Sequence, residues 1–213
     1  MINHLKVIYL PLLVPLLVLT GCFNLSREEP PQRHYVLGES QLEANPAPAE
    51  RLTGLSVGLR RVQVAEYLNT PLVVVRHGAH AIRFSEFHRW GEGLGGGINR
   101  AVASHLTTRA AFETINVVPW PPQTRHDYLI QIHLLRFEGQ VASANAAEGA
   151  AYLLATWEIV DPQDGAVLAR GTTDYQGDTW EAGDFDALVT LLEVGVRELS
   201  DDLLASLEEL TAP

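Results

Sequence analysis

The sequence predicts an α/β protein built as a single layered domain, in which a mixed β-sheet packs against two main helices. Three observations predict this class. Several segments alternate apolar and polar residues at the period of a strand, most clearly residues 127–137. A proline-glycine turn at residues 162–165 joins two further strands as an antiparallel hairpin. Two other segments repeat apolar residues at the four-residue spacing of a helix.

The first half of the domain is expected to hold short strands. A strand over residues 33–37 precedes a loop over residues 39–50, which is rich in alanine and proline. Residues 51–64 alternate, but the apolar phase changes at Arg60 and Arg61, which suggests a bulge or bend. After a turn at residues 65–70, a β-branched strand over residues 71–77 pairs with a short strand over residues 79–84.

The remaining strands complete a set of seven or eight. They cover residues 114–118, 127–137, 149–160 and 167–176. In residues 127–137 the side chains divide between two faces, with Gln131 and His133 on the polar face. The apolar face carries Tyr128, Ile130, Ile132 and Leu134.

The two helices differ in how clearly the sequence marks their starts. The first is expected over residues 87–109, with its regular part beginning near Ile98, because the glycines between residues 91 and 97 are poor helix formers. The second is expected over residues 185–210, capped by Asp184. The predicted buried stripes are Ile98, Val102, Leu106 and Ala110 in the first, and Leu188, Leu192, Val196, Leu199, Leu203 and Leu207 in the second.

The amino terminus carries an export signal. An apolar run over residues 7–19 follows Lys6 and is shorter than the roughly 20 residues that span a bilayer. It ends in a lipobox of Leu19, Thr20, Gly21 and Cys22, where small residues admit a protease and the thiol accepts a lipid. A stray buried cysteine behind an ordinary signal is the alternative, disfavoured because the chain has no other cysteine.

These observations predict the domain organisation. Residues 1–21 are expected to be a lipoprotein signal peptide, and residues 22–32 the lipidated cysteine with a polar tether. Residues 33–213 are expected to be the α/β domain. Diacylglycerol and an amide-linked chain such as palmitate on Cys22 would hold the protein on a membrane permanently.

Charge excludes some partners. The formal net charge is -11, which argues against nucleic acid, because phosphate binding needs clustered lysine and arginine. It also argues against electrostatic docking on anionic lipid head groups. We interpret the acidity as solubility rather than as an acidic docking surface.

No combination of residues resembles a catalytic site. The glycines at residues 93–97 lack the lysine and hydroxyl residue that complete a phosphate loop. His77, His80 and His88 have no carboxylate or cysteine at a familiar metal-ligand spacing. Ser85 stands near His88 but lacks the motif of a nucleophile elbow. We expect no enzymatic activity, no cofactor and no metal.

Aromatic side chains in irregular segments are the candidates for a contact with a protein partner. These are Tyr67, Trp90 and Trp120, since aromatic residues often anchor interfaces. The alternative is that they pack in the core.

An ordered set of weak motifs resembles the family of ABC-type transport auxiliary lipoproteins, also called PqiC-like lipoproteins, over nearly the whole chain. Glycines follow Trp90 and Glu92, where the family usually has proline and helix formers. The motifs are the lipobox, Tyr35-Val36-Leu37, the Glu66-Tyr67-Leu68-Asn69 turn between two strands, the stretch from Phe87 to Leu94, and a last helix with Phe185 and Leu199-Ser200-Asp201.

The resemblance implies a fold similar to the anticodon-binding-like and TolB amino-terminal folds. It implies a lipid-anchored periplasmic adaptor of diderm bacteria, which docks a protein with MCE (mammalian cell entry) domains at the inner leaflet of the outer membrane. Phe23 and Asn24 lack the aspartate that commonly retains lipoproteins at the inner membrane, although retention there stays an alternative. The number of copies stays open.

Two other functions remain as alternatives to the adaptor. One is a lipid carrier, whose mark would be an apolar pocket lined by both helices. The other is a lipoprotein regulator of a cell-wall enzyme. A periplasmic hydrolase would need Ser85, His88 and a carboxylate within hydrogen-bond reach.

Overall fold

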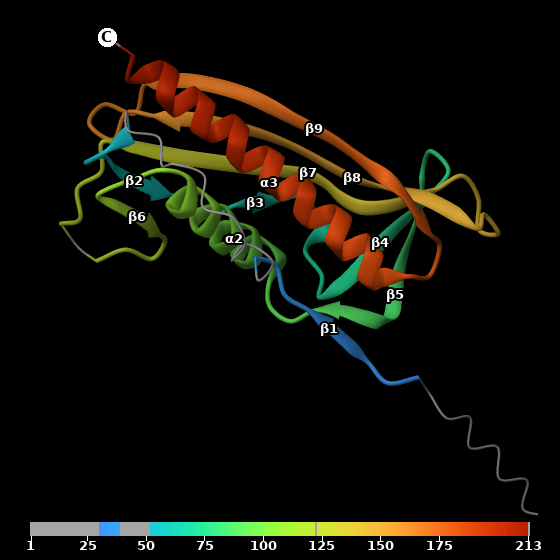
Figure 1. The fold of residues 1–213 in the computed structure, drawn as a ribbon. Coiled ribbons are helices and arrows are strands. Elements are labelled where there is room, and N and C mark those ends of the chain that lie inside the picture. The colour runs from blue at the N-terminus through green and yellow to red at the C-terminus, as the bar shows by residue number, and fades with distance from the viewer. Residues whose placement is uncertain (1–29, 39–51, 122, 213) are drawn as a thin grey trace, which may run out of the picture. The chain divides into compact units, whose positions relative to one another are not determined.

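The structure, a computed structural model, describes residues 30–38, 52–121 and 123–212. They form one nine-stranded mixed sheet with two α-helices and a short 3-10 helix (Figure 1). The strands are β1 Arg33–Tyr35, β2 Ser56–Leu59, β3 Gln63–Val64, β4 Leu72–His77, β5 Ala81–Trp90, β6 Thr114–Val117, β7 Tyr128–Val141, β8 Glu148–Val160 and β9 Val167–Glu181. The helices are η3 Glu66–Leu68, α2 Leu94–Arg109 and α3 Phe185–Leu210. The predicted α/β class with two main helices is confirmed.

Strand β7 is the centre of the sheet. Along one edge it pairs in turn with β2, β3 and β4, all parallel to it. Along the other edge it pairs with β8 in an antiparallel ladder, and β8 pairs with β9 in the same way. Strands β5 and β1 extend the sheet beyond β4, and β6 extends it beyond β2. Elements from both halves of the chain therefore depend on β7.

A β-bulge divides β7 into two parts with opposite side-chain phases. The β7–β8 register shifts between Leu134 and Arg136, so Leu135 is an extra residue in the ladder. Before it, even-numbered residues such as Ile132 are buried in the core; after it, odd-numbered residues such as Phe137 take that position. The bulge therefore directs Arg136, and with it Glu138 and Gln140, to the face of the sheet opposite the core.

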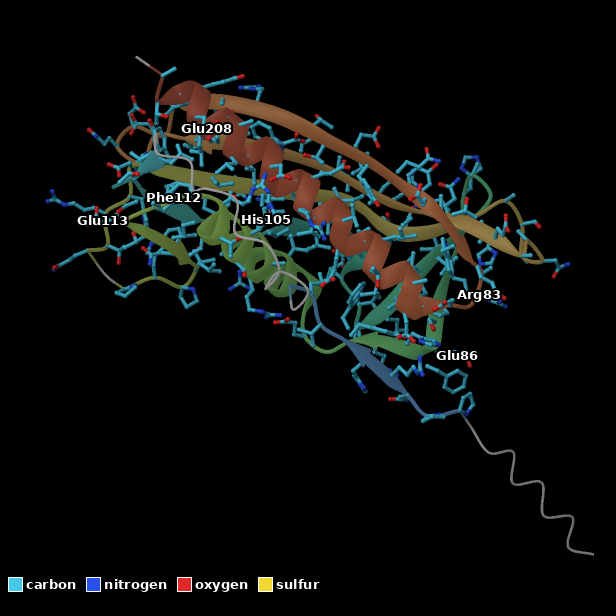
Figure 2. All side chains as sticks on the ribbon, viewed as in Figure 1. Arg83, Glu86, His105, Phe112, Glu113 and Glu208 are labelled. Carbon is cyan, nitrogen blue, oxygen red and sulfur yellow. The ribbon has the colours of Figure 1, made fainter. Side chains whose placement is uncertain are left out.

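Both helices lie against the same face of the sheet (Figure 1). Helix α3 packs on β8 and β9, and α2 contacts β3, β6 and α3. Between the helices, Nε2 of His105 lies 3.0 Å from a carboxylate oxygen of Asp201 (Figure 2). Every residue of the two predicted stripes is buried, and Asp184 accepts a hydrogen bond from the Ala187 amide as the predicted cap. In the described part of the chain, no helix covers the opposite face, which we call the open face.

The predicted start of the first helix is wrong. Residues 87–90 belong to β5, because His88, Arg89 and Trp90 pair with β1. The helix begins at Leu94 rather than near Ile98, so glycines form its first turn. A Cβ atom at Gly95 would lie 3.2 Å from the Val62 carbonyl oxygen, so the close approach of the preceding strand region favours glycine there.

The strands are also longer and more numerous than the sequence predicts. The sheet has nine strands rather than seven or eight, and β5, β7 and β9 extend beyond their predicted ends. The continuous β7–β8–β9 ladder supplies backbone hydrogen bonds past the point where the alternating pattern stops. The predicted bend at Arg60 and Arg61 is confirmed as the break between β2 and β3. The likeness to anticodon-binding-like and TolB folds stays a prediction.

Core packing predicts a large cost for shortening the middle of α3. Leu199 is fully buried, so Leu199→Ala should lower the free energy of unfolding by about 2–5 kcal/mol. Glu198 is exposed on the same turn, and Glu198→Ala should change that free energy by less than about 0.5 kcal/mol. Urea denaturation of both variants measures the difference, and equal losses would contradict this packing.

Candidate partner-binding site

The anchor residues lie outside the described part of the chain. Lipidation of Cys22 and the lipobox of Leu19, Thr20 and Gly21 therefore stay predictions. The described chain starts at Pro30 and enters the domain through β1, the outer strand beside β5. None of the helices among the described residues has the length and apolar character needed to cross a membrane.

Strand β1 is fastened to the start of α3. Nη1 of Arg33 lies 2.5 Å from a carboxylate oxygen of Asp186. The Tyr35 hydroxyl shares a hydrogen bond of 2.9 Å with Nδ1 of His88. The His88 ring stacks on Phe185 with ring centroids 4.0 Å apart and on Tyr35 at 5.9 Å. The entry point of the predicted tether is thus held by side chains from three elements.

The three predicted contact aromatics lie in three different surroundings. Trp90 is only 5% exposed and packs against Phe137 with ring centroids 5.6 Å apart, so it is a core residue and the expectation that it is exposed is wrong. Trp120 is half-buried and meets the edge of His126 at 4.8 Å. Tyr67 is half-buried in η3 and belongs to a cluster of charged residues.

This arginine cluster consists of Arg76, Arg136 and Glu138 with the rings of Tyr67 and Tyr152. The Glu138 side chain is fully buried on the open-face side of β7. One of its carboxylate oxygens accepts hydrogen bonds from Nε of Arg76 at 2.5 Å and Nε of Arg136 at 2.9 Å. The other accepts from Nη2 of Arg76 at 3.2 Å. One carboxylate therefore faces two guanidinium groups.

Two tyrosine rings hold the guanidinium groups in place. The Arg76 guanidinium lies 5.6 Å from the centre of the Tyr67 ring, and that of Arg136 lies 4.4 Å from the centre of the Tyr152 ring. The Tyr67 hydroxyl donates to the carbonyl oxygen of Leu135, the bulged residue, at 3.1 Å. The bulge, the 3-10 helix and the cluster are therefore directly connected.

Electrostatics keep the cluster ionised. The hydrogen bond to Glu138 raises the pKa of Arg76 above its usual value, although partial burial opposes this. Burial, and secondarily the Glu138 charge, raises the pKa of Tyr67 to about 12, so Tyr67 stays a neutral hydrogen-bond donor at physiological pH. With both arginines protonated, they outnumber the Glu138 carboxylate by one positive charge.

Two cavities bear on function. One, of about 360 Å³, adjoins the cluster and is lined by Arg76, Ala79, Arg136 and Gln140. A larger one, of about 680 Å³, lies before α2 and includes Arg61 and Trp90 in its lining. No residue of α3 lines that larger cavity, so it is not the pocket between both helices expected of a lipid carrier.

The residues considered for catalysis or metal binding are used otherwise. Oγ of Ser85 accepts a hydrogen bond from the backbone amide of His88, whose Nδ1 is engaged with Tyr35. His77 lies at the end of β4, and His80 lies in the turn that follows. Within residues 30–38, 52–121 and 123–212, no three histidine, cysteine, aspartate or glutamate side chains gather as a metal site.

The sequence analysis did not find the arginine cluster. Its predicted strand ended at residue 137, one residue before Glu138. Side chains of Arg136 and Glu138 within an otherwise apolar strand were the available signal. The bulge that turns them to the open face depends on pairing with β8, which the pattern of one strand does not encode.

Comparison with known proteins identifies one matching family model. Residues 35–203 match the family described as ABC-type transport auxiliary lipoprotein component. A search of curated proteins gives no match.

Solved structures share the fold at low sequence identity. A protein of family DUF330 from Xanthomonas campestris is 16% identical, with a TM-score of 0.65, and the match covers 84% of this chain and 96% of that one. A putative lipoprotein from Caulobacter crescentus is 16% identical at a TM-score of 0.40, with coverage of 71% and 87%. The PelC dodecamer from Paraburkholderia phytofirmans is 13% identical at a TM-score of 0.42, with coverage of 73% and 94%.

The setting of His88 predicts loss of stability in mild acid. Burial, and then the Arg33 charge, lowers the pKa of His88 below its usual 6.5. The unfolded chain therefore takes up this proton first as the pH falls, so the stability contribution is complete above about pH 6.5 and is lost below it. His88→Phe keeps a ring between Tyr35 and Phe185 and should flatten the dependence of unfolding free energy on pH.

A second histidine provides a comparison. Burial also lowers the pKa of His126, so the double variant with His88→Phe and His126→Phe should show a flatter profile than either single variant. Urea denaturation at several pH values between about 5 and 7.5 measures these slopes. Unchanged slopes in all variants would contradict the assignment.

Proposed function

The chain belongs to the family of ABC-type transport auxiliary lipoprotein components, and from this premise we propose that it is a non-enzymatic, lipid-anchored periplasmic adaptor of a lipid transport system with MCE domains. The observation that carries the proposal is the family match over residues 35–203, which starts within β1 and ends within α3. It thus includes the arginine cluster.

The amino-terminal sequence supports an anchored position. A lipobox ending at Cys22 follows a short apolar run, and about ten residues then lead to β1. A fully extended tether of that length spans at most roughly 35 Å, so the domain stays close to the membrane that holds the lipid. We place that membrane at the outer side of the periplasm, because Phe23 and Asn24 carry no retention aspartate.

The open face supports a role in protein recognition. Arginine and tyrosine, the residue types that often dominate binding energy at interfaces, meet there in one cluster. Tyr67, a contact residue in our sequence prediction, supports Arg76 within it. In our proposal this face contacts the MCE-domain protein, Trp120 is a further contact, and several copies can surround one partner.

A pull-down from the native cell tests the adaptor role. In mild detergent, the wild-type protein should bring down an MCE-domain protein, identified by mass spectrometry. Cys22→Ala should abolish the association of that protein with outer-membrane fractions, because the lipid is the link to the membrane. Ser26→Ala, in the predicted tether, leaves the lipobox intact and should behave like the wild type.

Other outcomes separate the alternatives. Co-purification of acyl lipid without an MCE protein would favour a carrier, and co-purification of a cell-wall enzyme would favour a regulator. Either result would remove the adaptor proposal. An MCE-domain protein in inner-membrane fractions with Cys22-dependent association would correct only the choice of membrane.

A further inference from the structure

We propose that the arginine cluster is a binding site for a carboxylate side chain of a protein partner, presented beside apolar residues. The site would recognise an aspartate or glutamate through the surplus positive charge of Arg76 and Arg136. This inference rests on the proposed function only for the identity of the protein that supplies the acid.

The first argument is the charge balance of the cluster. Two guanidinium groups share the single carboxylate of Glu138, so one positive charge is not neutralised within the cluster. The chain as a whole carries a net charge of -11 and has no lysine after Lys6, so this local excess runs against its overall composition. A second carboxylate would complete the pairing of both arginines.

The second argument is the hydrogen-bonding capacity that remains. Arg76 uses Nε and Nη2 on Glu138, while Arg136 uses Nε on Glu138 and Nη2 on Gln140. Nη1 of each arginine has no hydrogen-bond partner among the described residues. Both side chains are partly exposed, at 18% and 27%, and both line the cavity of about 360 Å³. These donors therefore face a space that a small acidic group can enter.

The third argument is preorganisation. The guanidinium planes are held by Glu138 from below and by the rings of Tyr67 and Tyr152 at 5.6 and 4.4 Å. An incoming carboxylate therefore meets donors that lose little further conformational entropy on binding. Glu138 is fully buried and does not compete for the open side of the cavity.

The surroundings favour a protein over a membrane as the source of the acid. Leu135, next to Arg136, is 42% exposed, and Phe84 is 40% exposed on β5. In the β4–β5 ladder, Arg76 is opposite Ile82 and Phe84 is two residues further along β5, so Phe84 shares the face of Arg76. Apolar groups around buried arginines are typical of interface centres. A strongly acidic chain is repelled by an anionic lipid surface.

A peptide titration tests the site directly. The purified full chain in a zwitterionic detergent is titrated with the blocked peptide Ac-Leu-Glu-Leu-Glu-Leu-NH2, and the Nε–H signals of the arginines are followed by NMR. The signals of Arg76 and Arg136 should shift in a saturable way that weakens with salt. The matched peptide with glutamine in place of glutamate should shift them at least tenfold less effectively.

Substitutions assign the binding to the cluster. Arg136→Gln should weaken peptide binding roughly tenfold, the effect of losing one charge-assisted hydrogen bond. Arg170→Gln, at an exposed arginine of β9, should leave it unchanged. Glu138→Gln keeps an oxygen acceptor for the arginines but removes the internal charge, so binding should become tighter. Dispersed amide spectra verify that each variant is folded.

Several results would overturn the proposal. These are equal binding of the glutamate and glutamine peptides, weakening by Arg170→Gln equal to that by Arg136→Gln, or tighter binding of inorganic phosphate than of the acidic peptide. Arg136-dependent binding to phosphatidylglycerol vesicles without peptide binding would assign the site to lipid and likewise overturn it. The titration uses this chain alone, so a failed pull-down with a positive titration would reject only the proposed partner.

Discussion

The β-bulge at Leu135 determines which side chains of β7 enter the core, and both faces of the sheet depend on that choice. Without the extra residue, the alternation of Ile130, Ile132 and Leu134 would continue to Arg136 and Glu138 and direct both charges toward α3. With it, Phe137 packs against Trp90 instead. A one-residue change of phase thus permits a dry core and a charged cluster on the same strand.

The cluster itself is costly to build in a purely structural role. Removing a carboxylate from water carries a desolvation penalty that ion pairing only partly offsets, and apolar residues of similar volume often serve stability as well. Glu138 is nonetheless fully buried at the centre of the sheet, with two arginines and two tyrosines arranged around it. Such an arrangement is easier to understand where recognition, rather than folding alone, requires fixed guanidinium groups.

Sequence patterns predicted the parts of this protein that local periodicity determines. The stripe of α3 from Leu188 to Leu207 and its Asp184 cap follow from one repeating pattern, and the structure contains both. Patterns failed where distant segments decide. Residues 87–90 are extended because β1 pairs with them, and Gly95 lies within a helix because Val62 approaches it closely. The arginine cluster joins β4, β7, β8 and η3, so no single segment indicates it.

The attachment of β1 has a mechanical consequence. If the chain is tethered through Cys22 as we propose, any tension between membrane and partner enters the domain at Arg33. The three residue pairs between β1 and β5 lie along the strand, so a pull along β1 stretches them together rather than opening them one at a time. The stacked rings of Tyr35, His88 and Phe185 connect the same point to α3. A short strand can in this way pass a force from a lipid anchor into both layers of the domain.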